Sequence, residues 1–212
     1  MELYLRKVGK KMAKKLATLV VPFYTQERWQ NWIVKVKESG FKPDDQEKGA
    51  IFVYMEDDIV LACLKVIAKY DKKLISKDEA LKYIAEIKDI VLKKIEQIDD
   101  DIDMMLESTQ VSLVAVFASC ECYINADYTK TRSFAKLLKG ALKAEKEENM
   151  GTALDDIAKI GANILAGGKF KEKDFDNVPE GIVAEWIDGV DCIGAAMIGD
   201  TSYKDDEPDS GT

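Results

Sequence analysis

Histidine is absent from the 212-residue sequence. Without an imidazole there is no histidine general base, no Ser-His-Asp or Cys-His catalysis, and no histidine-ligated zinc or iron. Glycine-rich phosphate motifs are missing as well, since neither a G-x-G-x-x-G pattern nor a P-loop occurs. Any chemistry would have to use carboxylates, lysines, tyrosines, thiols or hydroxyls, which excludes many common enzymatic mechanisms.

Cysteine is scarce, and the four cysteines show no C-x-x-C spacing. They lie within apolar stretches, at Cys63, Cys120, Cys122 and Cys192. This use is typical of small buried side chains in a reducing compartment. We therefore expect structural thiols and a cytoplasmic protein.

No apolar run is long enough to cross a membrane. The most apolar stretch, residues 112–124, is interrupted by Glu121 and is shorter than the roughly 20 residues that a bilayer requires. An earlier apolar run, residues 16–24, resembles a secretory signal, but it contains Pro22 and is followed by no small-residue cleavage site. We expect neither a transmembrane span nor secretion.

Charge is plentiful in the sequence and unevenly distributed. Hydrophobic residues at 47% and charged residues at 33% are typical of a folded globular protein, and the net charge is -8. Residues 1–21 instead carry a net positive charge, because their only acid is Glu2. Their basic residues are Arg6, Lys7, Lys10, Lys11, Lys14 and Lys15. We expect a basic segment over residues 1–21, one domain over residues 22–200, and a disordered acidic tail over residues 201–212.

Apolar residues recur at three- and four-residue spacing along most of the chain, which predicts helices. Residues 1–21 should form an amphipathic helix that ends before Pro22. A helix from Thr25 to Glu38 would carry Trp29 and Trp32 on its apolar face as a packing anchor. Further helices are expected over residues 44–70, 76–98, 111–124, 132–148 and 152–166, and a last one is expected after Asn177 with Pro179 in its first turn.

Three details of these helices carry specific expectations. Ser76 and Glu79 match a capping box, which fixes a helix start. The acidic cluster at residues 99–103 either bends the preceding helix or forms its solvated face. Residues 111–124 are apolar nearly all round and are expected to form the central helix, with a strand as the alternative. In the last helix, small residues are expected to allow close approach of a neighbouring helix: Gly189, Gly194 and Gly199, with Ala195 and Ala196. The sequence thus predicts an all-α, single-domain multi-helix bundle.

Three stretches of the sequence form a distinctive set of motifs. The first, F-Y-T-Q-E-R-W-Q-N-W over residues 23–32, contains the R-W-x-N-W element. The second contains M-E-D-D-I-V over residues 55–60, and the third is P-E-G-I-V-A-E-W-I-D-G over residues 179–189. Together they resemble an uncharacterised archaeal family of unknown function. The resemblance implies an archaeal cytoplasmic protein and brings no catalytic residues with it.

Acidic residues are the main catalytic candidates, because carboxylates from facing helices can hold Mg²⁺ or Mn²⁺. Glu56, Asp57 and Asp58 lie among apolar residues of the second stretch, so at least one of them should point inward and need a partner. We predict a divalent-cation site at Glu56 and Asp58 that Glu185 and Asp188 complete. The alternative is that a buried Arg28 or a lysine pairs with these acids and makes them structural.

Two functions follow from these observations. The first is a non-catalytic interaction or adaptor protein, with protein partners at Trp29 and Trp32 and with RNA, the ribosome or anionic lipid at the basic segment. In that case the lysines of residues 1–21 bind the partner; alternatively, this helix docks on the acidic body. The second is a Mg²⁺-dependent phosphohydrolase that acts on nucleotides. The sequence leaves open whether the chain forms a homo-oligomer.

Overall fold

The computed structural model describes residues 22–129, 133–168 and 178–199, and within these ranges every regular element is a helix. The elements are α2 (Gln26–Glu38), α3 (Gln46–Asp71), α4 (Lys77–Val91), α5 (Asp100–Asn125), α6 (Phe134–Lys146), α7 (Met150–Leu165) and α8 (Ile182–Gly199). The expected all-α bundle is confirmed. The helix predicted over residues 1–21 and the predicted tail lie outside the described residues.

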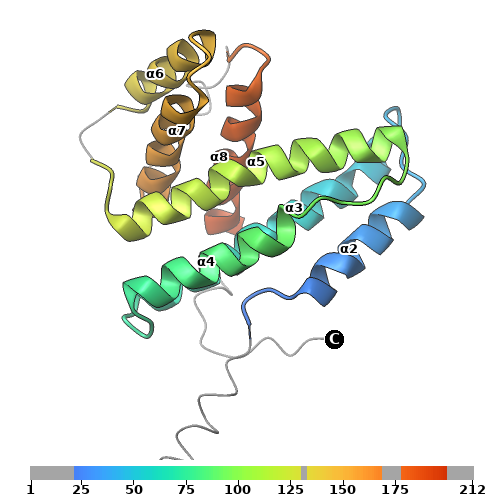
Figure 1. Cartoon of the computed structure of the whole chain (residues 1–212), viewed down its shortest axis with the longest axis horizontal. Helices are drawn as coiled ribbons and strands as arrows, with labels where there is room; N and C mark the ends of the chain where they lie inside the picture. The colour runs from blue at the N-terminus through green and yellow to red at the C-terminus, as the bar shows by residue number, and fades with distance from the viewer. Residues whose placement is uncertain (1–21, 130–132, 169–177, 200–212) are drawn as a thin grey trace, which may run out of the picture.

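Helix α5 is the centre of the bundle and packs against α3, α4, α7 and α8. Figure 1 shows α3, α4 and α5 running side by side, with α2 on one flank and with α6, α7 and α8 gathered at the other end. The stretch predicted to be the central helix is the apolar half of α5, and its Leu113, Val116 and Phe117 are fully buried. The alternative of a strand there is wrong.

The local signals for helix starts are confirmed in the structure. Thr25 accepts a hydrogen bond from the backbone N–H of Arg28 at 3.0 Å and so caps α2. Ser76 and Glu79 form the complete capping box at the start of α4. These caps satisfy backbone donors that the first turn of a helix leaves without an internal partner.

The boundary between α4 and α5 differs from the expectation. α4 ends at Val91 and an irregular connection, residues 92–99, follows, so the helix does not continue to residue 98. The acids begin a new helix: Asp99 accepts from the N–H of Asp101, and the first turn of α5 is acidic. Carboxylates are favourable there because they complement the positive end of the helix dipole.

The last helix also starts later than predicted, at Ile182, so Pro179 lies outside its first turn. The N-terminal turn is capped by a side chain from another helix, because Glu145 of α6 accepts from the N–H of Val183 at 2.9 Å. The expected close approach is confirmed at Gly189, where a Cβ would collide with the backbone carbonyl of Ser112 on α5, but not at Gly199, which has no described neighbour within 4 Å. Gly189 therefore lets α8 lie directly against the central helix.

Candidate functional site

Asp58 of α3 is held by two side chains of α2. The Arg28 guanidinium donates through Nε at 3.0 Å and through a terminal nitrogen at 2.5 Å, so the pair is bidentate. The indole N–H of Trp32 donates to the same carboxylate at 2.7 Å. Charge-assisted bonds of this kind are stronger than neutral ones. Asp58 is thus a structural acid that joins α2 to α3, as the arginine-partner alternative proposed.

Tyr24 completes this cluster at the N-terminal side of α2. Its ring is buried, and the Arg28 guanidinium lies 5.6 Å from the ring centroid, in cation–π contact. Burial and, next to it, the Asp58 carboxylate raise the pKa of the Tyr24 hydroxyl well above its ordinary value. The tyrosine is therefore neutral at all physiological pH values.

Glu56 lies two residues before Asp58 on α3 and points to α5 and α8. It is half-buried and accepts a hydrogen bond from the Ser112 hydroxyl. Burial raises the pKa of Glu56, and the negative charges of Asp57 and Asp188 raise it further, while the hydrogen bonds from Ser112 and Cys192 work in the opposite direction. This carboxyl group has acidic neighbours where Asp58 has a cation.

The four predicted metal ligands are only partly brought together. Glu56 and the exposed Asp188 are close enough to affect each other's charge, whereas Asp58 is turned toward Arg28. Glu185 is half-buried on α8. Within residues 22–129, 133–168 and 178–199, no three cysteine, aspartate or glutamate side chains gather in a way that could hold a metal ion. The cation site stays a prediction.

The predicted partner-binding residues are two tryptophans of α2 and six basic residues of the N-terminal segment. Trp29 is in the core with 1% exposure, and Trp32 is half-buried, with its indole N–H bound to Asp58 and Lys35 lying over its ring at 4.7 Å. The two tryptophans thus anchor α2 by packing. The basic residues Arg6, Lys7, Lys10, Lys11, Lys14 and Lys15 lie outside the described residues.

A groove that sequence reasoning missed runs between α2 and the connection that follows α4. We call it the α2 groove; one wall is α2 from Gln26 to Lys37, the other is residues 93–98, and its volume is about 460 Å³. Figure 1 shows α2 and this connection on the same flank of the molecule. Apolar side chains line the groove from both walls: Trp29, Ile33 and Val34 from α2, and Ile95 and Ile98 from the connection.

The second wall of the α2 groove is irregular but is fixed by side chains of α5. The Gln110 amide donates to the carbonyl of Val91 at 2.6 Å and to that of Lys93 at 3.0 Å. At the other end, Asp103 accepts from the N–H of Ile98 at 3.0 Å. Both ends of the wall are therefore tied to the central helix.

One sequence signal hints at the groove: Val34 is an apolar residue off the predicted apolar face of its helix, and in the structure it is 49% exposed. The expectation of a continuous helix over residues 76–98 concealed the second wall, because it placed Ile95 and Ile98 on a helix face instead of in an irregular segment.

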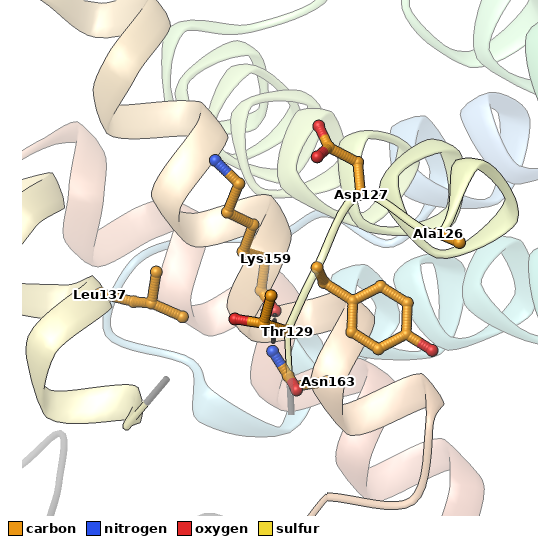
Figure 2. Close-up of a pocket in the computed structure, with 7 residues that line it drawn as sticks. Ala126, Asp127, Thr129, Leu137, Lys159 and Asn163 are labelled. Carbon is orange, nitrogen blue, oxygen red and sulfur yellow. Dashed lines mark hydrogen bonds between the residues drawn. The ribbon is translucent and has the colours of Figure 1, made fainter. Parts of the chain in front are cut away.

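A separate cavity of about 330 Å³ lies where the segment after α5 meets α6 and α7. Figure 2 shows Lys159 and Asn163 of α7 facing Thr129, with Leu137 of α6 at the side. The polar groups of α7 already have partners. Lys159 donates to Asp155 at 2.6 Å, and the Asn163 amide donates to the carbonyl of Lys159 at 2.7 Å. The Lys159 ammonium and the Asn163 amide nitrogen are thus engaged within α7.

The Cys122 thiol lies beside this cavity and donates to the carbonyl of Asp127 at 3.2 Å. Burial raises the pKa of Cys122 to about 11, which leaves the thiol protonated and unreactive at neutral pH. Cys63 and Cys120 are buried, and all four cysteines are free thiols. The expectation of reduced cysteines agrees with this arrangement.

Together these features define an all-α multi-helix bundle. Asp58 joins two of its helices, and a groove with aliphatic side chains lies along α2. In the part of the chain that the structure describes, no helix is both long and apolar enough to span a membrane. The chain belongs to a family of uncharacterised proteins conserved in archaea (DUF2150), whose model matches residues 22–206. No curated protein and no solved structure matches the chain.

The family assignment confirms the resemblance inferred from the sequence, and residues 1–21 precede the matched region. The three stretches that carried the resemblance converge on α3. Arg28 and Trp32 of the first bind Asp58 of the second, and Asp188 of the third lies near Glu56 of the second. This convergence places the motif acids near the junction of α2, α3 and α8, where Asp58 has a structural role through Arg28 and Trp32.

Proposed function

We propose that this protein is a non-catalytic interaction protein, an adaptor of the archaeal cytoplasm, that binds an amphipathic helix of a protein partner in the α2 groove. The observation that carries the proposal is the apolar lining of that groove. Val34 is 49% exposed there, and Ile33, Ile95 and Ile98 are half-buried along both walls. Such aliphatic surface is what the apolar stripe of a helix covers in helix-in-groove recognition.

The dimensions of the groove fit a short helix. Its α2 wall extends from Gln26 to Lys37, a distance of about 17 Å at 1.5 Å per residue. A partner helix of three turns would match this length and could place side chains at positions i, i+3, i+4 and i+7 over the lining. The rim on both walls is polar, with Gln30 on α2 and Gln97 opposite.

Residues 1–21 supply a second contact in this proposal. Their six basic residues in an otherwise acidic chain suit an anionic partner such as RNA or the ribosome. Removing residues 1–21 should then abolish RNA association and leave groove binding unchanged. An RNA interaction that is absent or insensitive to salt would contradict this part and favour docking of the segment on the body.

The groove is tested by a charge placed on its apolar lining. Val34→Asp should remove the protein partners that co-purify with the full chain from native cells after nuclease treatment. Val53→Asp is the matched control, because Val53 is a similarly exposed valine, at 54%, on α3 and outside the groove. Partners that are lost equally from both variants, or from neither, would overturn the proposal.

A further inference from the structure

The lysines of the α2 groove contrast with the charge of the whole chain. The chain has a net charge of -8, yet the groove is lined by Lys37, Lys93 and Lys94 and by a single acid, Glu96. Lys37 belongs to the α2 wall, and Lys93 and Lys94 belong to the opposite wall. Positive charge therefore lies on both walls of the groove, beside their apolar side chains.

These three lysines, unlike Lys42, Lys88 and Lys159, have no partner among the described residues. Lys42 pairs with Asp101 at 2.8 Å, Lys88 with Glu121 at 3.2 Å, and Lys159 with Asp155 at 2.6 Å. Within the described ranges, the ammonium groups of Lys37, Lys93 and Lys94 make no ion pair or hydrogen bond. All three are exposed and available to a ligand.

We infer that the helix bound in the α2 groove is acidic, with aspartate or glutamate on both flanks of its apolar stripe. This inference rests on the proposed function and adds the chemistry of the partner. Apolar residues would cover Ile33, Val34 and Ile95, while flanking carboxylates would reach the lysines of the two walls. Complementary charge of this kind sets the choice of partner and the rate of association more than the affinity itself.

A nucleic acid fits the same lysines less well. Single-stranded RNA is held by stacking its bases on exposed aromatic rings, but the one aromatic side chain that lines the groove, Trp29, is 1% exposed. The rest of the apolar lining is aliphatic. The surface therefore favours a protein segment.

An acidic segment could also come from this chain. Residues 201–212 contain Asp205, Asp206, Glu207 and Asp209, but their one large apolar residue is Tyr203. The segment thus offers the charge without an apolar stripe. A separate partner helix suits the groove better, and a variant that ends at residue 200 distinguishes the two sources.

The inference is tested by an unbiased selection. A phage-displayed library of helix-forming peptides, randomised at all surface positions, is selected on the full chain and counter-selected on Val34→Asn, which makes the lining polar without adding a charge that would itself select for acidic peptides. We expect the recovered peptides to be enriched in Asp and Glu on both sides of an apolar stripe. Their affinity should fall at least tenfold in the triple variant Lys37→Glu/Lys93→Glu/Lys94→Glu and should weaken steeply with salt.

Three outcomes of the selection would each overturn a different statement. Peptides that depend on Val34 but carry no excess of acid would overturn this inference and leave the groove as a helix site. Failure to recover any Val34-dependent peptide, from the full chain and from the variant ending at residue 200, would overturn the proposed function itself. Val34-dependent peptides recovered from the shortened variant alone would identify residues 201–212 as the occupant and overturn the assignment to a separate partner.

Discussion

Asp58 and Glu56 are two residues apart on α3, and their surroundings are opposites. Residues two apart on a helix project about 200° apart around its axis, so Asp58 meets the Arg28 guanidinium of α2 while Glu56 meets Ser112 of α5 and the acids near α8. One carboxylate is paired with a cation, and burial raises the pKa of the other. The comparison teaches that acids of the same motif can have opposite effects on stability.

The largest expected effect comes from removing the cation of the pair. Arg28→Ala would leave Asp58, whose side chain is 14% exposed, with the Trp32 indole but without its opposite charge. We expect urea unfolding to give a loss of about 1.5–3 kcal/mol, the range for hydrogen bonds to charged groups. The Arg28 side chain is 40% exposed, so the loss should stay below that of a fully buried pair.

Lys88→Ala is the control, because it breaks a more exposed pair with Glu121. We expect that change to alter the free energy of unfolding by less than about 1 kcal/mol. If the two variants lose the same amount, the Arg28–Asp58 pair is an ordinary surface contact and the contrast between the two acids disappears.

Replacing either acid by its amide and measuring stability at two pH values tests the difference between Glu56 and Asp58. Because the pKa of Glu56 is raised in the folded state, its contribution to stability is present below the unfolded pKa and is lost as the pH rises through the folded pKa. Glu56→Gln removes that loss and can still accept from Ser112. At pH 8 we expect its melting temperature to exceed that of the wild type by about 2–4 °C, or about 1 kcal/mol in a domain of this size.

Asp58→Asn is the matched change on the other side of α3 and should lower the melting temperature at the same pH. At pH 5 the advantage of Glu56→Gln should shrink, because the native carboxyl group is then more protonated. A Glu56→Gln variant that is less stable than the wild type at pH 8 would contradict the view that burial and nearby acids destabilise the Glu56 carboxylate.

The smallest effect is expected from divalent cations. If the acids near Glu56 are structural, calorimetric titration with Mg²⁺ or Mn²⁺ at millimolar concentration should give no saturable binding. A saturable isotherm that vanishes in Glu56→Gln/Asp188→Asn would contradict this expectation. It would support the alternative of a Mg²⁺-dependent phosphohydrolase.

Much of the fold could be predicted from the sequence because its signals are local. Thr25 and Ser76 cap helices through residues three positions away, and the apolar stretch of α5 has no polar face to expose. The boundary at Val91 could not be predicted, because Leu92, Ile95 and Ile98 keep helical spacing while they pack on the core from an irregular segment. Spacing alone does not distinguish these two conformations.

The candidate site depended on contacts between distant segments. The sequence indicated that an acid near Glu56 needs a partner, and Arg28 was one of the alternatives, but periodicity could not decide which acid it meets. The α2 groove was missed because its walls are about 60 residues apart in the chain and one of them was expected to be helical. Neither wall has an exposed apolar run that would mark it in the sequence.

The attachment of residues 92–99 to α5 has a consequence for any association at this flank. Gln110 and Asp103 hold the wall in position before a ligand arrives, so little of the chain has to be ordered on binding. Preorganisation of this kind lowers the entropic cost of association, which is often about 0.5–1.5 kcal/mol for each side chain that must be immobilised. Gln110, a residue of the central helix that does not itself line the groove, thereby helps to determine how tightly the groove can bind a ligand.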